Sequence, residues 1–312
     1  MAVNLETTFL GLRFQNPVLV ASGTFGYGEE NYEIMPFRLL GGLVTKTITV
    51  EPRAGNPPPR IVETDAGMLN SIGLANVGLE AFLRDKLPWI MEHAGESRII
   101  VNFAGFSVEE YVRLGEVLGR TPGIDALEVN LGCPNVHAGY VHFGADPGTV
   151  REVIAGVREK TDRPLIAKLT PNVTDIASLA EAAVRAGADA LSLINTLPGM
   201  KIDVERRKPV LGMGFGGLSG PALRPVGVAC VYKVYRHLRQ AGKAVPLIGI
   251  GGITCGRDAL EYIMAGADLV QVGTANFVHP QAALKVIEEL AFFCRERKIE
   301  KISELVGAAH GE

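Results

Sequence analysis

The segment "RAGADALSLI" (185–194) is nearly repeated in "MAGADLVQVG" (264–273). In both segments a helical pattern ends at a glycine, the residue that most often occupies the left-handed position after a helix. A short apolar run follows, and buried parallel strands have continuous apolar runs rather than alternating ones. Each segment therefore predicts a helix that leads directly into a buried parallel strand.

Runs of the same kind recur along the whole chain. Eight are found, at residues 18–21, 42–45, 99–103, 126–129, 165–169, 190–194, 247–250 and 269–272. Helical patterns occupy 147–160, 176–186, 225–241 and 257–265, and 281–298 has the pattern of a final packing helix. Eight strands alternating with helices predict a (β/α)8 TIM barrel, and we expect residues 1–312 to form a single domain.

Two connections are too long for simple barrel loops. They are residues 46–97, which include "EPRAGNPPPR" (51–60), and residues 195–224. Long loops in compact domains often act as lids or binding elements, and barrel active sites lie at the carboxyl ends of the strands. We therefore expect these inserted loops to lie over the C-terminal face of the barrel.

Composition excludes several classes of protein. The 312 residues carry a net charge of −3, which argues against binding to nucleic acid or a membrane surface. Four cysteines without a C-x-x-C pair argue against a structural metal or an iron–sulfur cluster on this chain, and against a secreted disulfide framework. No segment resembles a signal peptide or is apolar enough to cross a bilayer, so we expect a cytoplasmic protein.

Polar side chains gather where the predicted strands end. They comprise two lysines and three asparagines: Lys46, Lys168, Asn102, Asn130 and Asn195. Each alone would be ascribed to a turn or a solvated surface. A lysine inside a barrel mouth is costly unless it faces an anion, and asparagine amides suit the edges of a planar ring. Together they favour an anionic, heteroaromatic ligand or cofactor.

The last two predicted strands end in glycine-rich turns, "GIGGIT" (249–254) and "VGTANF" (272–277). In barrels these turns often direct backbone N–H groups at a phosphate, although they could simply be tight turns. A phosphate site opposite ring-binding groups favours FMN over NAD, which would normally require a Rossmann unit. The G-x-G-x-x-G at 212–217 is not followed by a helical pattern, and we interpret it as a loop.

Cys133 lies in "NLGCPNVHAG" (130–139), just after a predicted strand. A buried structural cysteine is the default interpretation. At the rim of a barrel, however, a thiol could take a proton, or act as a nucleophile with a histidine such as His137. We favour a general base over a nucleophile.

The chain resembles dihydroorotate dehydrogenase, an FMN enzyme of pyrimidine (UMP) synthesis. The resemblance runs from "NPVLVASGTFGYG" (16–28) to "VQVGTA" (270–275), with its strongest marks in "VTKTIT" (44–49), "GMLNSIGLANVG" (67–78) and "VNLGCPN" (129–135). It implies that Cys133 removes the C5 proton of dihydroorotate while hydride passes from C6 to N5 of FMN.

The resemblance to dihydroorotate dehydrogenase also implies two sets of binding residues. The substrate set is Lys46, Asn70, Ser71, Ile72, Gly73, Leu74, Asn130, Asn195 and Thr196, and the FMN set is Ser22, Lys46, Thr47, Asn102, Asn130, Lys168, Ile194, Gly220, Gly251, Gly252, Gly273 and Thr274.

The family includes soluble members with different electron acceptors. The stretch "PPPRIVETDAGMLNSIGL" (57–74) is more similar to the NAD-linked class 1B. This class implies a partner subunit with FAD and a [2Fe–2S] cluster, and a homodimer of this chain within a heterotetramer, with no metal site here. The alternatives are a fumarate-linked homodimer, a dihydropyrimidine dehydrogenase-like enzyme, and a non-catalytic FMN-binding redox or sensor protein.

Overall fold

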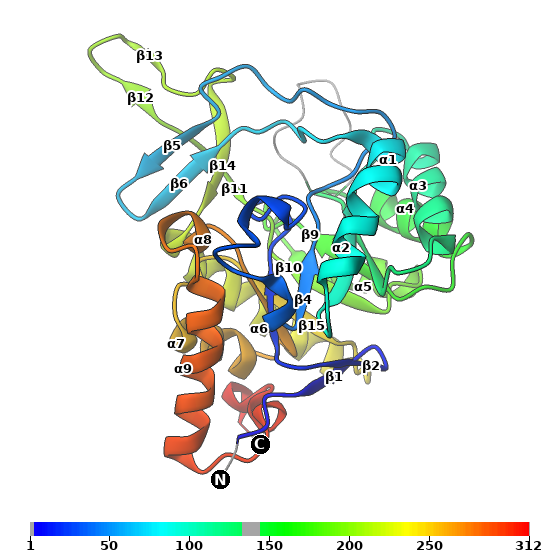
Figure 1. Cartoon of the computed structure of the whole chain (residues 1–312), viewed down its shortest axis with the longest axis vertical. Helices are drawn as coiled ribbons and strands as arrows, with labels where there is room; N and C mark the ends of the chain where they lie inside the picture. The colour runs from blue at the N-terminus through cyan, green and yellow to red at the C-terminus, as the bar shows by residue number, and fades with distance from the viewer. Residues whose placement is uncertain (1–2, 133–143, 312) are drawn as a thin grey trace.

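The core of the chain is a closed barrel of eight parallel strands (Figure 1). A computed structural model describes residues 3–132 and 144–311. The barrel strands are β3 (Val18–Val20), β4 (Gly42–Val44), β7 (Arg98–Phe103), β8 (Ala126–Asn130), β9 (Leu165–Leu169), β10 (Ala190–Leu193), β15 (Leu247–Ile250) and β16 (Leu269–Val272). They pair in the order β10-β15-β16-β3-β4-β7-β8-β9. Each coincides with one predicted run, so the predicted (β/α)8 barrel is confirmed.

Helices surround the barrel and pack their apolar faces on it. The longer ones are α3 (Val108–Arg120), α4 (Pro147–Arg158), α5 (Ile176–Arg185), α6 (Arg224–Gln240), α7 (Gly256–Met264) and α9 (Ala282–Arg297), and the shorter ones are α1 (Gly78–Ala81), α2 (Leu87–His93) and α8 (Ala275–Val278). Helices α3, α4 and α5 begin directly after the N-cap residues Ser107, Asp146 and Asp175, respectively. Each N-cap side chain accepts a hydrogen bond from a backbone N–H group in the first turn of its helix, which fixes where the helix starts. None of the helices in the described ranges has both the length and the apolar character needed to span a lipid bilayer.

A hairpin that the sequence did not predict closes the amino-terminal end of the barrel. Strands β1 (Thr7–Phe9) and β2 (Leu12–Phe14) bring Phe9 and Phe14 together, with ring centroids 6.0 Å apart in an edge-to-face arrangement. Both rings are buried against residues at the amino ends of the barrel strands, including Ile100, Ile166 and Leu269. The apolar plug leaves the opposite end of the barrel as the open one.

The repeated "AGAD" segments end in aspartates that tie neighbouring strands together. Asp268, before β16, accepts a hydrogen bond from the Leu247 N–H at 2.9 Å, and Asp189, before β10, accepts one from the Leu165 N–H at 2.8 Å. In both cases the aspartate's own N–H donates to the carbonyl of the same partner residue at 2.8 Å. The aspartate thus fixes the register of its strand against the preceding one.

The two long connections combine into a second sheet rather than remaining loops (Figure 1). Strands β5 (Ile61–Thr64) and β6 (Gly67–Asn70) come from the first connection, and β11 (Leu197–Met200) and β14 (Phe215–Ser219) from the second. They pair antiparallel in the order β11-β14-β6-β5. The G-x-G-x-x-G therefore runs into β14, and its interpretation as a loop is wrong for its last residues.

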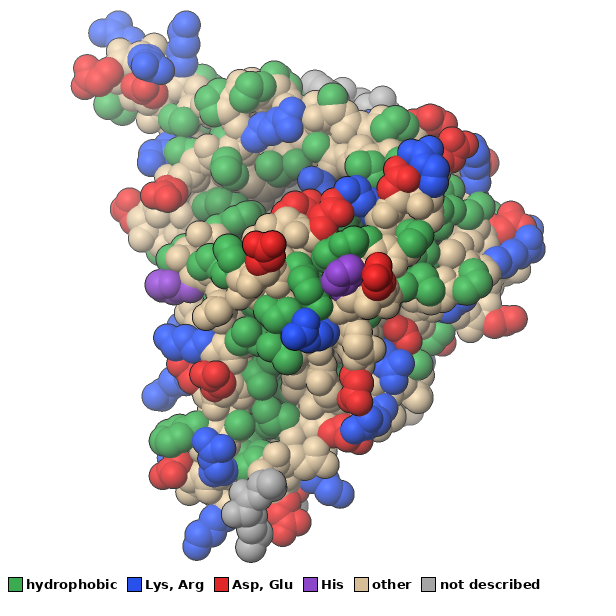
Figure 2. All heavy atoms as spheres, in the orientation of Figure 1, with side chains coloured by type: hydrophobic (Ala, Val, Ile, Leu, Met, Phe, Trp, Pro, Cys, Tyr) green, Lys and Arg blue, Asp and Glu red, His purple; other side chains and the backbone are tan. Residues whose placement is uncertain are grey.

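A small hairpin extends the second sheet away from the barrel. It consists of β12 (Ile202–Asp203) and β13 (Lys208–Pro209), and its exposed tip carries Glu205, Arg206 and Arg207. Figure 2 shows charged side chains of both signs gathered at this projection.

The two matched aspartates should respond differently to loss of charge. Burial raises the pKa of Asp268, against the smaller opposing effect of the hydrogen bond from Leu247. A raised native pKa means that Asp268 contributes most below about pH 4, near the unfolded-state pKa of aspartate, and that this contribution is lost as pH rises through the native pKa. The Asp268→Asn variant has no titrating group at this position, so it does not share the loss of stability that wild type shows as pH rises. The free energy of unfolding of the variant minus that of wild type should therefore increase between about pH 4 and pH 7.

Urea unfolding at several pH values measures this difference. Asp189→Asn is the matched control, because Asp189 is paired with Arg158 at 2.9 Å on the surface. Loss of this exposed ion pair in Asp189→Asn should cost less than about 1 kcal/mol at pH 7. A relative stability of Asp268→Asn that is flat or falls with pH would contradict the prediction.

Candidate active site

A cavity of about 420 Å³ opens at the carboxyl ends of the barrel strands. This volume lies within the range of small-molecule sites. Most of the residues predicted to bind substrate or cofactor line it: Ser22, Lys46, Thr47, Asn70, Ile72, Gly73, Leu74, Asn130, Lys168, Ile194, Asn195, Thr196, Gly220, Gly251, Gly252, Gly273 and Thr274. The tertiary structure therefore brings together side chains that are spread over some 250 positions of the sequence.

Two predicted residues do not line the cavity, and a third lies outside the residues that the structure describes. Ser71 is buried, and its hydroxyl accepts a hydrogen bond from Asn56 at 2.9 Å, away from the cavity. Asn102 is fully buried in β7 and does not reach the cavity surface. Cys133 lies outside the described residues, which stop at Gly132 before it.

Hydrogen bonds fix the orientation of Asn130, which ends β8. Its Oδ1 accepts from Asn195 Nδ2 at 3.0 Å, and its Nδ2 donates to Thr47 Oγ1 at 3.3 Å. Its carbonyl accepts a bond from the buried Tyr111 hydroxyl at 2.8 Å. Asn130 at the end of β8, Asn195 just after β10 and Thr47 just after β4 thus form a preorganised set of amide and hydroxyl groups on one wall.

Two lysines supply positive charge to the cavity. Lys168, on β9, is only 6% exposed, and its Nζ donates to Ser22 Oγ at 3.3 Å. Lys46 follows β4 and makes no salt bridge with any carboxylate in the part of the chain that the structure describes. Cations held in a partly buried site favour an anionic ligand, because such a ligand offsets the cost of desolvating them.

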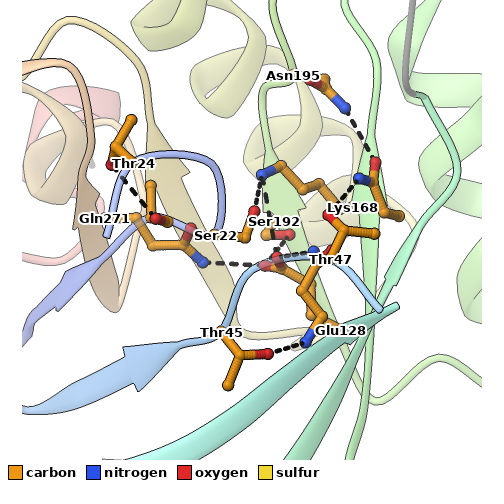
Figure 3. A network of polar contacts seen from close by, with 12 residues as sticks. Ser22, Thr24, Thr45, Thr47, Glu128, Lys168, Ser192, Asn195 and Gln271 are labelled. Atoms are coloured by element: carbon orange, nitrogen blue, oxygen red, sulfur yellow. Dashed lines mark hydrogen bonds and ion pairs between the residues drawn. The ribbon is translucent and has the colours of Figure 1, made fainter. Parts of the chain in front are cut away.

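A buried polar network that was not predicted from the sequence lies beneath Lys168 (Figure 3). Its centre is Glu128, in the middle of β8 and fully buried. Ser192 and Gln271, from β10 and β16, donate hydrogen bonds to it. The available signal was a single charged residue inside the apolar run 126–129, since charged side chains are almost never fully buried unless they are paired.

The glycine-rich turns after β15 and β16 form the opposite wall. Gly251 and Gly252 lead toward α7, and Gly273 and Thr274 lead into α8. Tyr262 donates its hydroxyl to the Gly251 carbonyl at 2.7 Å, and burial raises the pKa of Tyr262, so the hydroxyl remains a donor. The turn is therefore anchored from behind, which leaves its cavity side available to a ligand.

The inserted sheet supplies the remaining wall. Asn70, at the end of β6, donates through Nδ2 to the Gly217 carbonyl of β14 at 3.2 Å. This contact helps hold the stretch 70–74 at the cavity, where Ile72, Gly73 and Leu74 line it. The expectation that the long connections lie over the C-terminal face is thus met.

A second hollow, of about 550 Å³, lies at the amino ends of β7 and β8. Its charged side chains are engaged with one another: Arg98 pairs with Asp125 at 3.1 Å, and Arg13 lies 3.7 Å from Glu96. It therefore offers less free charge to a ligand than the cavity at the carboxyl ends.

The fold and the cavity define a TIM-barrel protein with a preorganised, cationic ligand site at the barrel mouth. The family model for dihydroorotate dehydrogenase matches residues 4–293. Two curated relatives, from Desulforudis audaxviator and Trichlorobacter lovleyi, are 54% and 51% identical to the chain. The alignments cover 99% of both chains in the first case and 96% in the second. Both relatives are named dihydroorotate dehydrogenase B (NAD(+)), catalytic subunit.

The chain therefore belongs to the dihydroorotate dehydrogenase family. A solved structure of DHODH from Eimeria tenella, in complex with ferulenol, has the same fold with a TM-score of 0.82. It is 24% identical in sequence, and the match covers 99% of this chain and 89% of that one.

Close backbone packing at the glycine turns gives a stability prediction. Gly252 has a φ of +68°, and a Cβ there would lie 2.7 Å from the Gly220 carbonyl oxygen. Gly252→Ala adds this collision to left-handed strain, so we expect it to lower the free energy of unfolding by more than about 2 kcal/mol.

Gly242 provides a matched control. Its φ is +71°, but nothing lies within 4 Å of the Cβ position, so Gly242→Ala should cost only the strain, about 1 kcal/mol. Urea unfolding of both variants measures the difference. If both variants lost the same free energy of unfolding, the close approach of Gly252 to the Gly220 carbonyl oxygen would not restrict the side chain at position 252.

Proposed function

We propose that this chain oxidises dihydroorotate to orotate in pyrimidine synthesis, with FMN bound in the cavity at the barrel mouth, as a single-domain cytoplasmic protein. The observation that carries the proposal is the convergence of Lys46, Lys168, Asn130 and Asn195 on one cavity. This convergence occurs in a chain that belongs to the dihydroorotate dehydrogenase family. This combination of cations and amides is complementary to an anionic ring with amide edges.

The donor set of the cavity fits FMN. Ser22, Thr47, Asn130 and Lys168 offer hydroxyl, amide and ammonium groups to a flavin ring, with Asn102 buried behind them. The glycine turns on the opposite wall offer backbone N–H groups to a phosphate, through Gly220, Gly251, Gly252, Gly273 and Thr274. Bound FMN would supply the hydride acceptor that amino-acid side chains cannot provide.

We assign the substrate to the part of the cavity nearest the inserted sheet. The ammonium of Lys46 would pair with the carboxylate of dihydroorotate, and Asn70, Asn130, Asn195 and Thr196 would hydrogen-bond its ring amides. The stretch 70–74 would cover the ring and exclude water from it. The hydrogen bonds between Asn130, Asn195 and Thr47 support this assignment because they hold the amides in place before a ligand arrives.

We assign the proton transfer to Cys133. It follows Asn130 by three positions and therefore follows the strand that ends at the cavity. A thiolate is a competent base near neutral pH, whereas a hydroxyl needs further activation. Its role is to take the C5 proton of the substrate.

For the electron acceptor we propose NAD⁺, reached through a partner subunit that carries FAD and a [2Fe–2S] cluster. The support is the name that the two relatives from Desulforudis audaxviator and Trichlorobacter lovleyi share, which specifies both NAD(+) and a catalytic subunit. We propose two copies of this chain in a heterotetramer with two copies of the partner.

An anaerobic half-reaction tests the proposed function. The purified full chain should carry FMN, and added dihydroorotate should bleach the flavin absorbance. NAD⁺ or fumarate alone should reoxidise the flavin slowly, because the electron-transfer subunit is missing. Bleaching by dihydrouracil but not by dihydroorotate would refute the substrate, and prompt reoxidation by fumarate would refute the NAD-linked assignment.

Cys133→Ser tests the proposed base. The variant should bind FMN as wild type does, but dihydroorotate should reduce the flavin at least about a hundredfold more slowly at neutral pH, because a hydroxyl is a far weaker base. Stopped-flow absorbance measures this rate. Cys230→Ser is the control, since Cys230 lies on α6 outside the cavity and should have the wild-type rate. An unchanged rate in Cys133→Ser would exclude the thiol as the base.

A further inference from the structure

Glu128 is a carboxylate enclosed inside the barrel. It is 0% exposed, and it accepts hydrogen bonds from three other barrel strands (Figure 3). Asn102 Nδ2 donates to Oε1 at 2.6 Å, while Ser192 Oγ and Gln271 Nε2 donate to Oε2 at 2.8 and 2.9 Å. All three donors are neutral, so they orient the carboxylate without balancing its charge.

Lys168 is the cation that faces this carboxylate. Its Nζ lies 4.0 Å from Glu128 Oε1, and its side chain is 8% exposed. Among residues 3–132 and 144–311, no other cation lies within salt-bridge distance of Glu128. A buried ion is very costly unless it is paired, so the two charges depend on each other.

Lys168 and Glu128 differ in their access to the cavity. Lys168 lines the cavity, and its Nζ also donates to Ser22 Oγ, another lining residue. Glu128 does not line the cavity. Any ring bound above Lys168 therefore meets the ammonium directly and the carboxylate only through it.

We propose that Glu128 is a positioning residue that holds the Lys168 ammonium at the cavity floor and offsets part of its charge, and so sets the reduction potential of the bound flavin. The inference rests on the proposed function, which places FMN above Lys168. A reduced flavin carries more negative charge than an oxidised one, so a nearby cation favours reduction and its counter-ion opposes that effect.

A purely structural role for Glu128 predicts something different. Ser192, Gln271 and Asn102 would then serve with it only to fill the barrel interior with satisfied polar groups. Substitution of Glu128 would then lower the free energy of unfolding of the protein but leave the reduction potential of a correctly bound flavin unchanged. The reduction potential therefore separates the two roles, whereas activity alone does not.

Glu128→Gln is the main variant, because it removes the charge and preserves the shape and an acceptor oxygen. Spectroelectrochemical titration of the FMN-loaded full chain measures the potential. We expect the balance between oxidised and reduced flavin to shift at least tenfold toward the reduced form, which is a rise of about 30 mV for a two-electron couple. An unchanged or lower potential, with FMN bound, would overturn the proposal.

Two further measurements test whether Glu128 acts through Lys168. Ser192→Ala removes a neutral donor and keeps both charges, so it should lower stability without moving the potential. In a Lys168→Gln background, the effect of Glu128→Gln should fall to less than half of its size in the wild-type background, as a double-mutant cycle measures. A shift of full size there would mean that Glu128 acts on the flavin directly.

Glu128→Asp keeps the proposal testable if Glu128→Gln does not retain FMN. Shortening the side chain withdraws the carboxylate from Lys168, so the potential should rise, but by less than in Glu128→Gln. A wild-type potential in Glu128→Asp would then overturn the proposal. If wild-type protein itself binds no FMN, the proposed function fails, and that outcome is distinct from failure of the role of Glu128.

Discussion

All eight barrel strands run parallel, and the site depends on this single constraint. Parallel strands in a closed barrel end at one rim, so residues that follow different strands must meet there. Lys46 follows β4, Lys168 lies on β9 and Gly252 follows β15, yet all three line one cavity. The aspartates before β10 and β16 help hold this arrangement, because each bonds to the first residues of the neighbouring strand.

The barrel interior changes in polarity along its axis. At the amino end, Phe9 and Phe14 close the barrel with an apolar plug. Toward the carboxyl end, Glu128 and Gln271 replace apolar contacts with buried hydrogen bonds. Buried polar groups are tolerated only when they are satisfied, and here several strands contribute to satisfying them. The polar layer places a charged, hydrogen-bonded floor directly beneath the cavity.

The second sheet gives the cavity its cover. Its central contact joins β6 and β14, which are more than 140 residues apart in the sequence. Neither strand can form alone, since short strands need a partner and a packing face. The pairing also carries the stretch 70–74 to the cavity, so one long-range contact links the inserted segments to the site.

Local sequence was sufficient to predict the eight strands, five of the six longer helices and most of the lysines, asparagines and glycines at the rim, but it did not predict α3 and it placed Asn102 at the rim rather than in the barrel interior. These features are encoded locally, because continuous apolar runs indicate buried strands and helical periodicity indicates the packed faces of helices. The second sheet, the plug around Phe9 and the network around Glu128 were decided only by the tertiary structure. In each of them, a residue's role depends on partners far away in the sequence. For Glu128, burial makes the carboxylate unfavourable unless Asn102, Ser192, Gln271 and Lys168 surround it, and only the closed barrel brings them together.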